Sequence, residues 1–170
     1  MHRRPKIFST GLLLTVWLLA SCGQYDIKVN DKLVYTPAKL IQVQGISDPA
    51  LANCLEQAIA DKLITSTAQL KELNCSNAGI ETLDGLASYY GLEQLKLSSN
   101  QIRNLVELEK LTRLVNLWLD DNAVIDIVPL SRLPQLALLD VSENSRMQCP
   151  SPGLFASSVS VLIDSRCKNP

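Results

Sequence analysis

Apolar residues recur in the middle of the chain with a period of 22 residues. Four segments, residues 70–80, 92–102, 114–124 and 136–146, read LKELNCSNAGI, LEQLKLSSNQI, LVNLWLDDNAV and LALLDVSENSR. They align on the template L-x-x-L-x-L-x-x-N-x-I. The L-x-L alternation predicts a short strand with one buried face. Repetition at this period predicts that successive strands lie side by side as a parallel sheet.

The second half of each unit has a different pattern, with an apolar residue at every third position. A three-residue period is typical of short 3₁₀ turns or extended segments, which would form the opposite, convex side. The residues concerned are Ile80, Leu83 and Leu86, then Ile102, Leu105, Leu108 and Leu111, then Val124, Ile127, Leu130 and Leu133.

The repeat resembles the leucine-rich repeat family, in its 22-residue bacterial class, to which the internalins also belong. The resemblance covers roughly residues 47–167. It implies an α/β solenoid, a short array with a concave parallel sheet and a 3₁₀ or extended convex side. One buried row is expected from Leu73, Leu95, Leu117 and Leu139, and the next from Cys75, Leu97, Leu119 and Val141.

Asparagine occupies the ninth template position in three repeats, as Asn100, Asn122 and Asn144. The chain turns inward there, and backbone groups would otherwise lack hydrogen-bond partners. An amide side chain both donates and accepts, so stacked asparagines are expected to form a ladder along the solenoid. The first repeat has Ala78 at this position, which places the ladder in doubt at that end.

Repeats bury their apolar edges only against neighbours, so both ends of the array need covers. Residues 47–69 predict an N-terminal helical cap, with Asp48 as the N-cap residue and Pro49 at the first helical position. Residues 70–146 hold the four repeats, and residues 147–170 are assigned to a C-terminal cap. In residues 22–46, the lipidated N-terminus described next, alternation around Asn30 and Asp31 predicts a small β-hairpin.

Residues 1–21 have the organisation of an export signal. Basic residues precede a 14-residue apolar stretch, which is shorter than the roughly 20 residues of a membrane span. The motif LASC that follows resembles the lipobox of bacterial lipoproteins, which implies cleavage before Cys22 and a diacylglyceryl group on its thiol. Such chains anchor a protein stably to a membrane. Gly23, where an Asp would resemble an inner-membrane retention signal, favours the outer membrane, with the periplasmic side preferred to the cell surface.

With Cys22 consumed by lipid, four cysteines remain, an even number for the oxidising cell envelope. Three pairings are possible in principle. The expected caps favour Cys54 with Cys75, because Cys54 lies near the apolar stripe of the helix and Cys75 on the buried side of the first strand. Cys149 with Cys167 would then fold the tail over the open end, closing that cap by a disulfide. The closely spaced cysteine pairs of a four-thiolate zinc site do not occur.

Composition narrows the possible functions. The 170 residues are 46% hydrophobic and 19% charged, with a net charge of −1, as in an ordinary globular domain. Cleavage before Cys22 would leave 13 Lys and Arg against 17 Asp and Glu, a net charge of −4, which disfavours nucleic-acid partners. It would also remove His2, the single histidine, and with it histidine-dependent catalysis and metal binding. We therefore expect no enzyme, no cofactor and no metal site.

Trp118 occupies a position that should face solvent in the middle of the concave sheet. An aromatic residue ringed by polar groups is typical of an interface hot spot. A cation–π contact with Lys96 would instead make it an internal feature. The expected binding face consists of Lys96, Asn116, Trp118, Asp120, Asp121, Leu138, Asp140 and Glu143.

The function expected from this pattern is protein–protein interaction by a lipid-anchored module of the cell envelope. The acidic residues of the face favour a basic protein or peptide as partner. Two alternatives remain open. The protein can be a structural or assembly lipoprotein with an inert concave face, or it can bind glycan or peptidoglycan, because an exposed tryptophan can stack on a sugar ring.

Overall fold

The computed structural model describes residues 26–167, and the chain divides after Pro37 into two units. In the first unit, β1 (Ile27–Val29) pairs antiparallel with β2 (Lys32–Tyr35). Asn30 and Asp31 connect them with φ angles of 49° and 60°. Two successive left-handed residues are what a two-residue hairpin turn requires, and Asn and Asp tolerate that conformation well. All residues of both strands are exposed.

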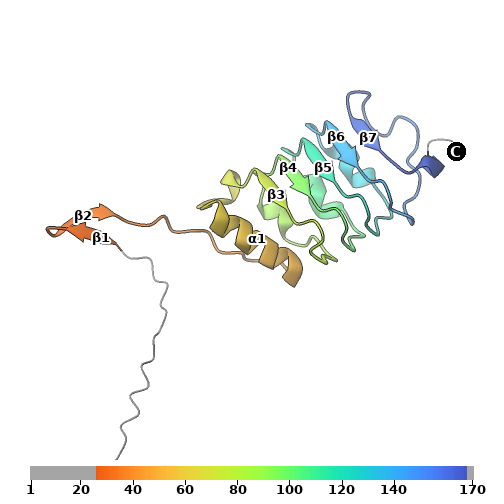
Figure 1. The fold of residues 1–170 in the computed structure, drawn as a ribbon. Helices are drawn as coiled ribbons and strands as arrows, with labels where there is room; N and C mark the ends of the chain where they lie inside the picture. Colours follow the sequence, from red (N-terminus) through yellow and green to blue (C-terminus); the bar gives the residue numbers. More distant parts are fainter. Residues whose placement is uncertain (1–25, 168–170) are drawn as a thin grey trace, which may run out of the picture. The chain divides into compact units, whose positions relative to one another are not determined.

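The second unit, from Ala38, is a solenoid. Helix α1 (Pro49–Asp61) precedes five strands: β3 (Glu72–Asn74), β4 (Gln94–Lys96), β5 (Asn116–Trp118), β6 (Leu138–Asp140) and β7 (Ser160–Leu162). The strands form one parallel sheet in the order β3-β4-β5-β6-β7, each in register with the next (Figure 1). This parallel sheet fits the predicted α/β solenoid, and its exposed face is called the concave face below.

Short 3₁₀ helices form the opposite side of the solenoid, where the three-residue period predicts them. They span Leu86–Ser88, Val106–Lys110 and Val128–Arg132. The apolar residues of strands and 3₁₀ helices meet in one continuous core, which also takes in Leu51, Leu55 and Ile59 of α1. The buried rows expected from the template are buried in all four repeats, with exposed fractions between 0% and 2%.

Strand β7 lies in the tail that the sequence analysis assigned to the C-terminal cap. Its residues continue the 22-residue register, because Ser160, Val161 and Leu162 pair with the three residues of β6. The template is weak here: Ser158 stands where the repeats have leucine, and Arg166 where they have asparagine. The sequence signal for a fifth repeat is therefore lost, although the backbone still adopts the strand.

Two disulfides join the ends of the solenoid to their neighbouring segments, in the pairing that the sequence analysis favoured. Cys54 of α1 is bonded to Cys75 directly after β3, with Cα atoms 5.8 Å apart. Cys149 is bonded to Cys167, with Cα atoms 5.2 Å apart. The first bridge ties the helix to the buried side of the first strand. The second closes the loop that carries β7.

Candidate functional site

The concave face of the sheet is formed by two rows of outward-pointing side chains. Strand residues alternate between the two faces of a sheet, and the middle residue of each repeat strand is the buried leucine. The strand register therefore defines both rows. One row consists of Glu72, Gln94, Asn116, Leu138 and Ser160, and the other of Asn74, Lys96, Trp118, Asp140 and Leu162.

Trp118 lies at the centre of this face, as expected from the sequence, and its side chain is partly exposed. Its register partners are Lys96 on β4 and Asp140 on β6. The ammonium nitrogen of Lys96 lies 4.9 Å from the centroid of the indole ring, within the range of a cation–π interaction. The lysine thus covers part of the ring, and the side chain as a whole stays only partly exposed.

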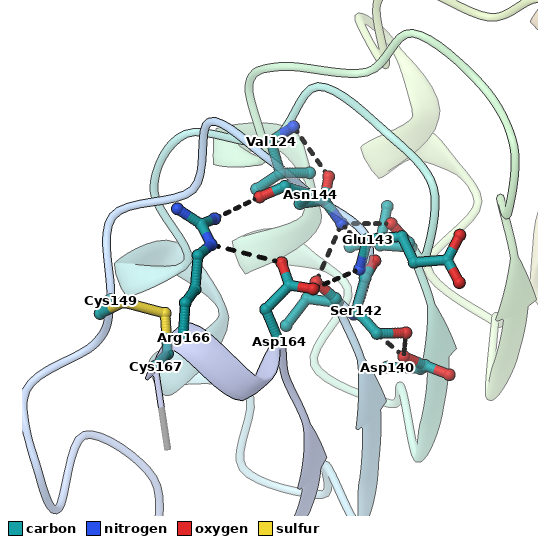
Figure 2. A network of polar contacts seen from close by, with 11 residues as sticks. Val124, Asp140, Ser142, Glu143, Asn144, Cys149, Asp164, Arg166 and Cys167 are labelled. Atoms are coloured by element: carbon teal, nitrogen blue, oxygen red, sulfur yellow. Dashed lines mark hydrogen bonds and ion pairs between the residues drawn. A yellow bond between two sulfur atoms is a disulfide. The ribbon is translucent and has the colours of Figure 1, made fainter. Parts of the chain in front are cut away.

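Two aspartates flank the tryptophan and are held by serine hydroxyl groups. Asp120 accepts a hydrogen bond of 2.6 Å from the hydroxyl of Ser98. Asp140 accepts one of 2.6 Å from the hydroxyl of Ser142 and one of 3.1 Å from its backbone amide (Figure 2). These donors are neutral, so the hydrogen bonds bring no positive charge to either carboxylate. Within residues 26–167, neither aspartate belongs to an ion pair.

Asp121 and Glu143 lie in the turns that follow β5 and β6 rather than on the strands. Both have left-handed backbones, with φ angles of 53° and 60°, and both are exposed. Asn77 and Ser99 occupy the same turn position in the earlier repeats, with similar φ angles. The two acidic residues are therefore exposed in the turns directly after the strands of the concave face.

Leu138 is partly exposed on the concave face, and Leu162, which the sequence analysis did not include, is 44% exposed in the other row. The C-terminal half of the face therefore carries Trp118, Leu138 and Leu162 beside Asp140. The N-terminal half is polar, with Glu72, Gln94 and other hydrophilic residues. Leu162 lies 22 residues after Asp140, but the weak template of the tail hides this register in the sequence.

The asparagine ladder positions the turns that carry the acidic residues. The side-chain oxygen of Asn144 accepts from the amide of Val124, one repeat earlier, and its nitrogen donates to Leu119 in that repeat and to Val141 and Ser142 in its own. Asn122 makes the same kind of contacts one repeat earlier. Each asparagine thus hydrogen-bonds the backbone of the preceding repeat.

Asn100 shows why Ala78 is tolerated. Its oxygen accepts from the amides of Ala78, Gly79 and Ile80, all in the first repeat. An asparagine at position 78 would serve a repeat before the first one, where helix α1 lies instead. The first repeat therefore receives its ladder contacts from Asn100 although Ala78 stands at its own ladder position.

Asp48 connects α1 to the first repeat. One carboxylate oxygen accepts from the amides of Ala50 and Leu51 and caps the helix, and the other accepts from the amides of Glu81 and Thr82. Partial burial raises the pKa of Asp48, but these four amide donors together lower it by more, so its pKa lies below the ordinary 3.8. The carboxylate is therefore charged at neutral pH and fixed in place.

Comparison with solved structures finds internalins of Listeria monocytogenes. Internalin C2 is 28% identical over 71% of this chain and 60% of that chain, with a TM-score of 0.58. The functional domain of InlJ, described as including a cysteine ladder, is 24% identical over 73% and 29% of the two chains, with a TM-score of 0.59. Internalin inlF is 19% identical over 71% of this chain and 44% of that chain, with a TM-score of 0.52. No protein-family model and no curated protein sequence matches the chain.

The matched region spans less than two thirds of each internalin chain. Among residues 26–167, no helix is both long and apolar enough to cross a membrane. The same residues contain no group of three or more His, Cys, Asp or Glu side chains arranged to hold a metal ion. The solved neighbours and the five-stranded parallel sheet together identify the fold as an internalin-like leucine-rich repeat solenoid.

Proposed function

We propose that the protein is a lipid-anchored module of the bacterial cell envelope that binds another protein or peptide with its concave face. The observation that carries this proposal is the partly exposed Trp118 at the centre of that face, beside carboxylates that belong to no ion pair within residues 26–167. Interface hot spots are enriched in tryptophan and lie near the centre of the contact. The internalin-like fold supports a general role in binding proteins.

The chemistry of the face favours a partner with apolar and basic groups close together. Leu138 and Leu162 extend the apolar surface around Trp118, and Asp140 lies between Trp118 and Leu162 in the same row. With Asp120, Asp121 and Glu143 nearby, the acidic groups of the face outnumber its single lysine, Lys96. Such a field attracts basic segments and gives salt-dependent association.

The contact between Lys96 and Trp118 makes a glycan ligand less favourable. Stacking on a sugar needs an open face of the indole ring, and the lysine ammonium group already lies over that ring. A protein side chain can instead approach the edge of the ring without displacing the lysine.

The anchor and the helical cap are part of the proposal. Cys22 and the signal segment 1–21 lie outside the described residues, so the sequence alone supports the anchor. The lipobox supports lipidation of Cys22, and Gly23 favours the outer membrane. Helix α1 supports the capping role, because its buried residues join the repeat core and Cys54 is bonded to Cys75. An oxidising envelope compartment agrees with both disulfides.

The binding face is tested by Trp118→Ala in a pull-down from envelope extract, with chemical cross-linking to retain weak partners. Tyr90→Ala is the matched control, because Tyr90 is 53% exposed and lies outside the two rows of the concave face. We expect Trp118→Ala to lose the partners that the wild type and Tyr90→Ala retain, with little change in stability. Unchanged partners, or a stability loss of about 3–5 kcal/mol typical of a core aromatic, would contradict the proposal.

The anchor is tested separately by metabolic labelling with a lipid precursor. The wild-type chain should take up the label, and Cys22→Ser should not. Equal labelling of the two chains would show that Cys22 is not the attachment site. This outcome would leave the proposal for the concave face intact.

A further inference from the structure

The two outer edges of the repeat sheet are covered differently. At β3, the outward carbonyl of Glu72 accepts a hydrogen bond of 2.8 Å from the ammonium group of Lys62, and the sulfur of Cys54 lies 3.4 Å from the carbonyl of Asn74. Helix α1 packs beside this strand. The N-terminal edge of the sheet is therefore blocked.

At β7, the other edge is open among the described residues. The amide of Ser160 donates to Ala137, and the carbonyl of Leu162 accepts from Val141, so these two residues face β6. Because backbone groups alternate along a strand, the amides and carbonyls of Val161 and Ile163 point the other way. Within residues 26–167, no strand pairs with that side of β7.

The apolar core is also incompletely covered at this end. Leu139 and Val141 of the last full repeat are 0% exposed, whereas Val161 and Ile163, at the same template positions, are partly exposed. Val159 of the same segment is partly exposed as well. At the opposite end, Leu73 and Cys75 are only 2% exposed. An unpaired strand edge and an open core thus occur together.

The segment that forms this end lacks the charges that protect exposed edges. No Asp, Glu, Lys or Arg occurs between Met147 and Ile163, although 19% of the chain is charged. Edge strands of monomeric proteins are usually blunted by lysine, proline or an inward-pointing charge. A row of free backbone groups flanked by valine, leucine and isoleucine is instead a template for another strand.

We propose that β7 pairs with β7 of a second copy of this chain, antiparallel and about a two-fold axis at Val161. The amide of each Val161 would donate to the carbonyl of the other, and the amide of each Ile163 to the carbonyl of Val159 in the other copy. The amide of Val159 is already satisfied by Ala156. The register thus uses the free donors, and the two sheets become one.

The same register is compatible in charge. It places Ser160 opposite Leu162 of the other copy and Ser158 opposite Asp164. Asp164 is paired with Arg166, whose nearest side-chain nitrogen lies 3.5 Å from the carboxylate, and Arg166 also donates to the carbonyl of Asn144 (Figure 2). No like charges among these residues face each other. The partly exposed Val161 and Ile163 side chains of the two copies would cover each other, which is the part of the contact expected to stabilise it.

The test is sedimentation of the purified chain carrying Cys22→Ser, so that no lipid contributes to association. The contact is a short strand with its flanking residues, and interfaces below about 1,200 Å² are usually weak. We expect a monomer–dimer equilibrium that depends on concentration. Val161→Pro removes the central outward donor, and proline is tolerated on the free side of an edge strand. It should give monomers at every concentration at which the parent chain dimerises.

Two controls make the result specific. Leu33→Ser in the hairpin, where the leucine is 57% exposed, should leave the dimer unchanged. Hydrogen exchange of the parent chain provides a readout without a β7 variant: the amides of Val161 and Ile163 should become protected as concentration rises, and the Tyr90 amide should not. A parent chain that stays monomeric, a dimer that survives Val161→Pro or is lost in Leu33→Ser, or exchange at Val161 independent of concentration would overturn the proposal. Capture of only a different protein by β7 would also overturn it.

Discussion

The N-terminal and C-terminal ends of the solenoid differ in how completely the apolar core and the outer strand edge are covered. At the first strand, apolar residues of α1 join the core, Asp48 accepts hydrogen bonds from four backbone amides, and Lys62 donates one to the carbonyl of Glu72. At the last strand, a disulfide-closed loop leaves β7 with a free edge and Val161 partly exposed. Strands in the same register can therefore contribute very different stability, because the neighbours of each strand decide how much apolar surface it buries.

The direction of the asparagine ladder adds to this difference. Each asparagine hydrogen-bonds the backbone of the repeat before it. The last repeat lacks such a contact, because Arg166 stands where the next asparagine would be. Asp164 and Arg166 take over part of that task by contacting the amide of Glu143 and the carbonyl of Asn144. We therefore expect the C-terminal end to open first when the protein is destabilised.

Core truncation at the two ends should give the largest contrast. Leu73→Ala removes a side chain that is 2% exposed, and we expect a loss of about 2–5 kcal/mol in unfolding free energy. Val161→Ala removes partly exposed methyl groups and should cost about 1 kcal/mol. Val141→Ala, which is fully buried, is the control for residue type and should cost more than Val161→Ala. Urea denaturation measures all three, and equal costs for the two valines would mean that the C-terminal core is closed.

The two disulfides close loops of similar length but differ in burial, so comparing them should separate the chain-entropy contribution to stability from the packing contribution. Their sequence separations are 21 and 18 residues, so chain entropy assigns each about 3 kcal/mol. Cys75 is also buried, whereas Cys149 is exposed, so replacing Cys54 and Cys75 by serine should cost more than replacing Cys149 and Cys167. Thermal unfolding of the two double variants measures the difference. Identical melting temperatures would indicate that both bridges stabilise the protein only by restricting the unfolded chain.

Some of the features behind these contrasts could be predicted from the sequence, and others could not. The 22-residue period determines the strands β3 to β6, the buried leucines and the concave position of Trp118, because burial at a regular spacing leaves a regular pattern. Strand β7 has the same register but carries Ser158 and Arg166 at template positions, so its pattern is hidden. Two of the four hydrogen bonds of Asp48 are the local helix-capping contacts that its N-cap position predicts. The other two come from residues 33 and 34 positions away, which no local pattern contains.

Acid should weaken the N-terminal end through Asp48. Its folded-state pKa lies below 3.8 despite burial, because four amides donate to the carboxylate, so its contribution is present above the unfolded pKa and is lost as pH falls through the folded pKa. Asp48→Ala leaves those amides without their acceptor and should cost about 2–3 kcal/mol at neutral pH. Chemical denaturation between pH 7 and about pH 2 measures this, and the variant should show a shallower decline in acid.

Two further substitutions sharpen the assignment to Asp48. Asp48→Asn keeps one acceptor oxygen, which can serve the helix or the first repeat but not both, so its stability should be intermediate. Asp164→Ala, at the other end, removes an acceptor for one amide and an exposed ion pair, and should cost about 1 kcal/mol or less. A larger cost for Asp164→Ala than for Asp48→Ala would reverse the order of the two ends.

The smallest effect is expected in the turn after β4. Ser99 has a φ angle of 55°, a left-handed conformation that strains most residues, and its counterparts in other repeats include Asn77, which tolerates it better. Ser99→Gly should relieve this strain and, after the entropy cost of glycine, raise the unfolding free energy by about 0.5 kcal/mol. Ser98→Gly in the same turn is the control, because it removes the hydrogen bond to Asp120 and should destabilise the protein. Equal destabilisation by both glycines in urea titrations would show that the left-handed turn carries no strain that glycine can relieve.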